Sequence, residues 1–144
     1  MAVSFHEKSP AFKLNNKKLL KQWIKETIVK EHYIPGDINF VFDTDEKVYQ
    51  ANVKYLHHDW LTDVIAFEYN EGVKINGDIL ISVERVRENA EKYGVSAEEE
   101  LRRVMIHGVL HLCGYEDKDK AQQEGMRKKE NRYLDLWEKI RKRG

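Results

Sequence analysis

The sequence predicts an α+β fold, in which residues 1–144 form a single domain with a small mixed sheet packed on helices. Segments with helical spacing and segments with strand alternation follow one another without a regular βα order. The chain contains no repeat and no linker rich in Pro, Gly or Ser, and both prolines, Pro10 and Pro35, are expected in connections. A length of 144 residues with 41% apolar composition suits one hydrophobic core and is short for two.

The first half of the chain is expected to form two strands and two helices. A short strand lies around Val3 and Phe5, and residues 37–43 form a second, because apolar and polar residues alternate there. Residues 15–30 and 44–58 carry their apolar side chains at helical spacing. These apolar positions are Leu19, Leu20, Trp23, Ile24 and Ile28 in the first helix and Val48, Ala51 and Tyr55 in the second.

The second half is expected to form two strands followed by three helices. In order, these elements cover residues 62–69, 77–83, 84–94, 96–114 and a stretch that begins near Asp119. The helix over 96–114 begins with a capping box of Ser96 and Glu99, and Gly114 suits the reversal at its end. The last helix is amphipathic, with apolar residues at Met126, Tyr133, Leu134, Trp137 and Ile140.

Charge and cysteine content exclude several classes of protein. Twenty-five basic residues balance twenty-five acidic ones, so nucleic-acid binding has to come from a local patch rather than from the net charge. The single cysteine, Cys113, excludes an intramolecular disulfide and is expected in the core. No apolar run resembles a signal peptide or a membrane span, so we expect a cytoplasmic protein without a membrane partner.

Two histidines lie four residues apart near the end of the capped helix. At this spacing His107 and His111 project from one face of the helix and can reach a single cation. Gly114 then reverses the chain, so a side chain of the following loop can approach the same point, and we expect Asp117 to be the third ligand. HxxxH pairs also arise by chance, but neutral imidazoles on an apolar helix face need partners. The pattern therefore predicts a metal site.

The stretch HGVLHLCGYED resembles the signature of the YbeY family of metal-dependent endoribonucleases, which act in the maturation of ribosomal RNA. NVKYLHHDWLTDVIAF, from Asn52 to Phe67, is similar to an upstream block of that family in its spacing, and GDILIS and MRKKENRYL resemble its next strand and its closing helix. The resemblance implies an α+β fold, one divalent ion per chain with zinc as the expected metal, cleavage of single-stranded RNA, and RNA of the ribosome as the partner. The oligomeric state stays open.

Two positions depart from the family pattern. Asp117 stands where the family has a third histidine, so the resemblance implies His107, His111 and Asp117 as the ligands; a carboxylate also suits harder ions than zinc. Leu56 stands where the family has an arginine with an implied role at the RNA phosphate. The spacing does not decide whether His57, His58, Lys54 or a basic residue on another element supplies the missing charge.

A metal with three protein ligands supports hydrolysis, because it activates water and polarises a phosphoryl or carbonyl oxygen. The residue after the first histidine is Gly108, whereas HExxH peptidases have their general base there, which disfavours a small zinc metallopeptidase. A non-catalytic ribosome assembly or RNA-binding factor with a structural metal is the other alternative. Glu116 and Asp63 are candidates for a general base, but the sequence assigns no catalytic residue.

The end of the chain is basic. From Lys118 to Gly144 there are ten basic and five acidic residues, and this stretch follows directly on the expected metal loop. A basic face beside the metal would suit RNA phosphates, and the solvated side of a helix explains the same charges equally well.

Overall fold

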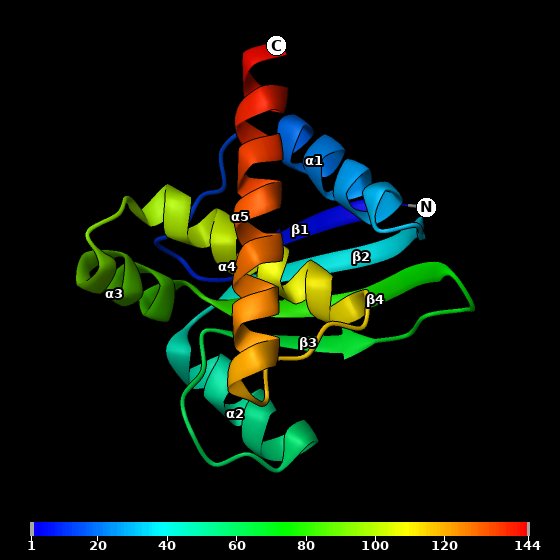
Figure 1. Cartoon of the computed structure of the whole chain (residues 1–144). Helices are drawn as coiled ribbons and strands as arrows, with labels where there is room; N and C mark the ends of the chain where they lie inside the picture. The colour runs from blue at the N-terminus through cyan, green and yellow to red at the C-terminus, as the bar shows by residue number, and fades with distance from the viewer. Residues whose placement is uncertain (1, 144) are drawn as a thin grey trace.

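The computed structural model describes residues 2–143, which form one four-stranded sheet and five helices (Figure 1). The elements are, in chain order, β1 (Val3–Glu7), α1 (Lys17–Lys30), β2 (Ile34–Asp43), α2 (Asp45–Leu56), β3 (Val64–Glu68), β4 (Lys74–Ser82), α3 (Val83–Tyr93), α4 (Ala97–Leu112) and α5 (Lys120–Arg143). The number and type of the elements are those expected from the sequence.

The sheet is mixed. Its strand order is β1-β2-β4-β3; β1, β2 and β4 run parallel, and β3 pairs antiparallel with β4 at one edge. The parallel neighbours are joined through helices, whereas β3 and β4 are joined by a short connection, as each kind of pairing requires. This arrangement confirms the α+β fold.

The prediction that Pro35 lies in a connection is wrong, because β2 begins at Ile34 and includes the proline. Pro35 pairs with Ile75 of β4, and the register shifts between Pro35 and Ile38. On the other side of β2, the pairing with β1 starts at Ile38. Pro35 therefore lies in a part of β2 that is paired with β4 but not with β1, just before the register shift. A residue without an N–H is tolerated at such a position.

Helices cover both faces of the sheet. Alternate residues of a strand point to opposite faces, and accordingly Ile79 belongs to the main core whereas Leu80 packs against a second cluster formed with α2. Figure 1 shows α5 crossing in front of α4, with the sheet behind both and α2 beside β3. The main core lies between the sheet and helices α1, α4 and α5.

Helix α2 departs from its expected face. Its buried residues are Val48, Ala51 and Asn52, while Tyr55 is 58% exposed. Tyr55 lies in the last turn, next to the loop that leads to β3, and its ring meets that of Phe67 edge to face. The helical spacing was correct, but the packed face runs through Val48, Asn52 and Leu56, and Tyr55 lies beside it.

Helix α4 approaches the sheet closely, with a glycine at the contact. A Cβ atom on Gly108 would come within 2.7 Å of Cγ2 of Ile79 on β4. One turn later, Leu112 packs over Gly77 of β4. A Cβ atom on Gly77 would come within 2.7 Å of Cδ2 of Leu112. These two contacts fix the position of the last turns of α4, which carry the candidate metal ligands. Among residues 2–143 no helix is both long and apolar enough to cross a membrane.

Candidate metal centre

The last two turns of α4 bring His107 and His111 together. Their Nε2 atoms lie 3.0 Å apart, and their rings meet edge to face with centroids 4.6 Å apart. The other faces of these turns, which include Ile106, Val109 and Leu110, are buried in the core. Core packing therefore decides which face of α4 the two imidazoles occupy.

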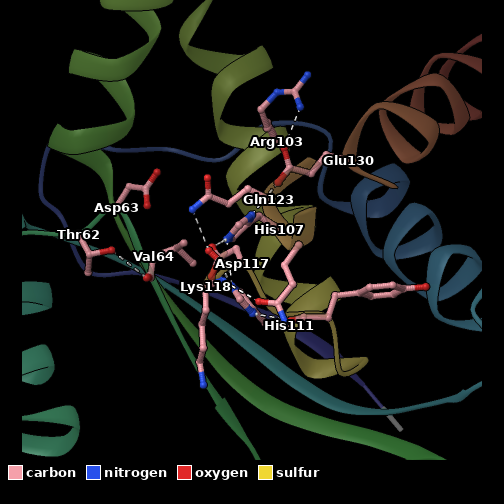
Figure 2. Close-up of polar contacts among 12 residues, drawn as sticks. Thr62, Asp63, Val64, Arg103, His107, His111, Asp117, Lys118, Gln123 and Glu130 are labelled. Atoms are coloured by element: carbon pink, nitrogen blue, oxygen red, sulfur yellow. Dashed lines mark hydrogen bonds and ion pairs between the residues drawn. The ribbon is translucent and has the colours of Figure 1, made fainter. Parts of the chain in front are cut away.

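The turn after α4 returns the chain to these histidines. Gly114 has φ +100°, which favours glycine, and its N–H donates to the carbonyl oxygen of His111 at 3.0 Å, while that of Tyr115 donates to Leu110 at 3.1 Å. This pair of bonds is a Schellman motif. The chain then brings Oδ2 of Asp117 to 3.2 Å from Nε2 of His107 and 3.5 Å from Nε2 of His111 (Figure 2). The structure thus brings together all three residues expected as ligands.

The other nitrogen of each imidazole has its own partner. Nδ1 of His107 lies 2.6 Å from Oε2 of Glu130, a buried residue of α5 whose Oε1 accepts a hydrogen bond of 2.8 Å from Arg103. Nδ1 of His111 lies 2.8 Å from the carbonyl oxygen of Tyr115. A carbonyl or carboxylate on the second nitrogen is the usual outer partner of a metal-binding histidine, because it fixes the tautomer and the ring orientation.

These partners leave three acceptors pointing at one place. The carbonyl oxygen of Tyr115 and the ionised carboxylate of Glu130 can only accept, so both Nδ1 atoms must carry hydrogen. In the neutral imidazoles Nε2 then holds a lone pair, and the two lone pairs face each other and the carboxylate of Asp117. Such an arrangement is repulsive unless a cation lies between the three atoms. A proton or a metal ion can fill that role.

The spacing of the three atoms fits a metal ion. Their separations are 3.0, 3.2 and 3.5 Å. A tetrahedral zinc ion with bonds of about 2.0–2.1 Å holds its ligands about 3.3–3.4 Å apart, and an octahedral ion with bonds of about 2.1 Å holds neighbouring ligands about 3.0 Å apart. Two nitrogens and one oxygen suit either kind of ion, so the geometry supports a divalent metal without selecting one.

The two histidines differ in basicity. Burial opposes the charged form of His107, but the hydrogen bond and the charge of Glu130 outweigh it and raise its pKa. Burial and the neighbouring charge of His107 together lower the pKa of His111. Burial also opposes ionisation of Glu130, but its bonds with His107 and Arg103 hold the pKa of that carboxyl below its usual value. The lowered pKa favours the neutral form of His111, which holds a lone pair on Nε2.

The three acceptors line a pocket of about 420 Å³, which we call the histidine pocket. Its wall also includes Leu56, His58, Trp60 and Asp63. Of the two candidate general bases, Asp63 reaches the pocket, and burial raises its pKa. Glu116 is not among the lining residues; it is exposed and lies 3.5 Å from Lys118.

The structure distinguishes between the three residues near Leu56 that could supply the charge of the missing arginine. His58 lines the histidine pocket, whereas Lys54 and His57 do not. Nζ of Lys54 instead lies 5.1 Å from the ring centroid of Tyr55, and His57 is the left-handed C-cap of α2. Leu56 packs on the cluster of α2 and adds only apolar surface to the pocket.

The basic C-terminal stretch is neutralised in part. Lys129 pairs with Glu31, Arg141 with Glu138 and Arg143 with Glu26. Arg127 lies near the centre: it lines a neighbouring hollow that shares Asp63, His107 and Asp117 with the histidine pocket. Part of the stretch therefore forms ion pairs, and one of its arginines lies beside the candidate metal centre.

The sequence interpretation missed Glu130, although a signal was present. Met126, Glu130, Tyr133 and Trp137 recur at helical spacing on the buried face of α5, so the glutamate occupies a core position. A carboxylate in such a stripe needs a buried partner. Cys113 was expected in the core, and this is confirmed: it is buried, and burial raises the pKa of its thiol to about 12.

Comparison with known proteins identifies similar sequences over nearly the whole chain. The model of the family described as endoribonuclease YbeY matches residues 3–138. Proteins named endoribonuclease YbeY are 48% identical in Flavobacterium johnsoniae, over 88% of this chain and 91% of the relative, and 42% identical in Parabacteroides distasonis, over 93% and 94%. The Flavobacterium psychrophilum protein of that name is 52% identical over 80% of this chain and 82% of its own.

A solved structure has the same fold. The solution structure of TM1509 from Thermotoga maritima superposes with a TM-score of 0.63 and 27% sequence identity, and the match covers 96% of this chain and 93% of that one.

Proposed function

This chain belongs to the endoribonuclease YbeY family, and we propose that it is a metal-dependent enzyme that cleaves single-stranded RNA during the maturation of ribosomal RNA. One observation supports this above the others: Nε2 of His107, Nε2 of His111 and Oδ2 of Asp117 converge as three acceptors on the wall of an open pocket. We propose a cytoplasmic location and ribosomal RNA as the partner.

His107, His111 and Asp117 are the proposed ligands of one zinc ion. When bound, such an ion activates water for hydrolysis and polarises a phosphoryl oxygen. Glu130 keeps the His107 ring in place through Nδ1, and the Tyr115 carbonyl does the same for His111. Because both rings are held before a metal arrives, binding requires little rearrangement.

The surroundings suit a phosphodiester substrate. The ligand atoms face a pocket rather than the closed interior, and an open coordination position is typical of catalytic rather than structural sites. Arg127 lies in the adjoining hollow, where its guanidinium can neutralise a phosphate of a chain that passes the centre. These features favour an enzyme over a factor with a structural metal.

Peptidase chemistry of the HExxH type fits poorly. The position that holds the glutamate in such enzymes is Gly108, which faces Ile79 so closely that even a Cβ atom would collide. A glutamate there would push α4 away from the sheet.

The proposed function is tested with the purified full-length chain and a single-stranded RNA. Cleavage that stops in a chelator and returns with added zinc is expected, together with about one equivalent of metal in elemental analysis. His111→Ala should lose both metal and cleavage, whereas His6→Ala, which changes an exposed histidine on β1, should lose neither. Full cleavage by a metal-free protein would overturn the proposal.

A further inference from the structure

The loop between α2 and β3, residues 57–63, forms part of the rim of the histidine pocket and is fixed in place. The buried Asn52 side chain donates to the carbonyl oxygen of Trp60 at 2.9 Å, and the His58 N–H donates to the carbonyl oxygen of Asn52 at 3.1 Å. The hydroxyl of Tyr49 donates to Asp59. At the end of the loop, the N–H of Ser82 donates to the carbonyl oxygen of Asp63 at 2.9 Å.

This fixed loop holds an aromatic pair in solvent. The rings of His58 and Trp60 stack with centroids 4.2 Å apart and planes at 16°. Trp60 is nevertheless 57% exposed, whereas Trp23 and Trp137 are buried in the core. Folding gains little from a large apolar ring in this position, because most of its surface stays in water. An exposed ring held on a fixed backbone is suited to binding a planar group.

Few side chains of the histidine pocket can contribute positive charge next to the His58–Trp60 pair. Besides the proposed ligands, its lining contains the carboxyl groups of Asp63 and Glu68 but no lysine or arginine. His58 is the lining residue, apart from His107 and His111, whose side chain can carry a positive charge. An imidazole N–H can donate to a phosphate oxygen while the adjacent indole face accepts a base.

We propose that His58 and Trp60 form a binding platform for one nucleotide of single-stranded RNA next to the metal centre. The base stacks on the exposed face of Trp60, and an imidazole N–H of His58 donates to the neighbouring phosphate. Bases in a duplex are already stacked on their neighbours, so a platform of this kind favours single strands. The inference rests on the proposed function, since it assumes RNA as the substrate.

Trp60 itself reports the binding. It is the exposed tryptophan of the chain, since Trp23 and Trp137 are buried, so quenching of tryptophan fluorescence by an added oligonucleotide measures stacking on this ring. We expect a short single-stranded RNA to quench the emission of His111→Ala or of metal-free wild-type protein, neither of which is expected to cleave it. The same sequence in a duplex should quench much less.

Substitutions test the roles of the His58 and Trp60 rings one at a time. Trp60→Ala should weaken RNA binding by about tenfold or more, as for other aromatic stacking partners of bases, while Trp60→Phe should retain most of the affinity. His58→Phe keeps a ring for the stack but removes the N–H donor, and it should weaken binding by about twofold to tenfold. In these variants binding is followed by fluorescence anisotropy of a labelled RNA.

The matched control is Tyr69→Ala. Tyr69 is 58% exposed, as Trp60 is, but it does not line the histidine pocket. The Tyr69→Ala substitution should leave RNA binding unchanged. The inference is overturned if Trp60→Ala and His58→Phe bind and cleave RNA like the wild type, an outcome that leaves the proposed function standing. If the wild type neither binds nor cleaves any single-stranded RNA, both proposals are wrong.

Discussion

The two histidines of α4 lie one turn apart, yet different regions of the molecule hold them. His107 is held by side chains, because Glu130 of α5 bonds its Nδ1 and Arg103 of α4 bonds Glu130. His111 is held by the main chain, through the Tyr115 carbonyl of the turn after α4. A side-chain support adds charge and can be removed by one substitution. A main-chain support is neutral and depends on the fold of the turn.

A residue far away in the sequence, Glu31, anchors the turn that supports His111. The Tyr115 hydroxyl donates to Oε1 of Glu31 at 2.6 Å, and Tyr133 and Lys129 of α5 bond the other oxygen of the same carboxylate. Burial opposes ionisation of Glu31, but these bonds outweigh it and hold the pKa of the carboxyl below its usual value. Glu31, at the end of α1, therefore ties the turn to two helices.

Removing a ligand should have the largest effect. His107→Ala and Asp117→Ala should each lose the metal and lower kcat/KM for RNA by about a thousandfold or more, because a metal contributes several kcal/mol to the stabilisation of the transition state. Metal content after dialysis and single-turnover rates measure both effects. If both variants keep a full equivalent of metal, the ligand assignment is wrong for both residues.

Removing the charged support should have the next largest effect. Glu130→Gln retains the shape of the side chain but not its charge, and it should weaken metal binding or activity by about tenfold to hundredfold, as for other outer partners of metal-binding histidines. A competition titration with a chelator measures the affinity. Glu138→Gln is the matched control, since this exposed glutamate of the same helix pairs with Arg141 on the surface. Equal effects of the two substitutions would refute a special role for Glu130.

Loosening the main-chain support should have a smaller effect. Tyr115→Phe removes the bond to Glu31 but leaves the carbonyl that faces His111. We expect a loss of about 1–2 kcal/mol in the free energy of unfolding, and a change of less than about tenfold in metal affinity. Calorimetry and the same competition titration give the two values. A loss of metal as large as in Glu130→Gln would mean that the two supports contribute equally.

The smallest expected effect is on the pH dependence of stability. Because the pKa of Glu31 is lower in the folded than in the unfolded protein, its contribution to stability is complete above the unfolded value, about 4.3, and is lost as the pH falls through the folded value. Measured in a chelator, the Tm of Glu31→Gln should therefore fall less steeply between about pH 5 and pH 3 than that of the wild type. If the Tm values of the two proteins fall in parallel as the pH is lowered, the lowered pKa of Glu31 is contradicted.

The sequence alone determined the features that are local along the chain. Helical spacing, the Ser96 cap and Gly114 sufficed to place His107, His111 and Asp117 together, because the three residues lie within one helix end and its turn. The family followed from the same stretch and its neighbours. Local spacing decides these features because a helix fixes the relative directions of its side chains regardless of what packs around it.

Only the tertiary structure decided which residues support and surround the centre. Glu130 reaches His107 across 23 positions of sequence and Tyr115 reaches Glu31 across 84, and the choice of His58 over Lys54 and His57 required the folded pocket. The two errors have the same origin: Pro35 joins a strand before the pairing of that strand with β1 begins, and Tyr55 lies beside the packed face of α2, which runs through Asn52 and Leu56. Spacing along a chain specifies the direction of a side chain, but only packing between elements specifies what it meets.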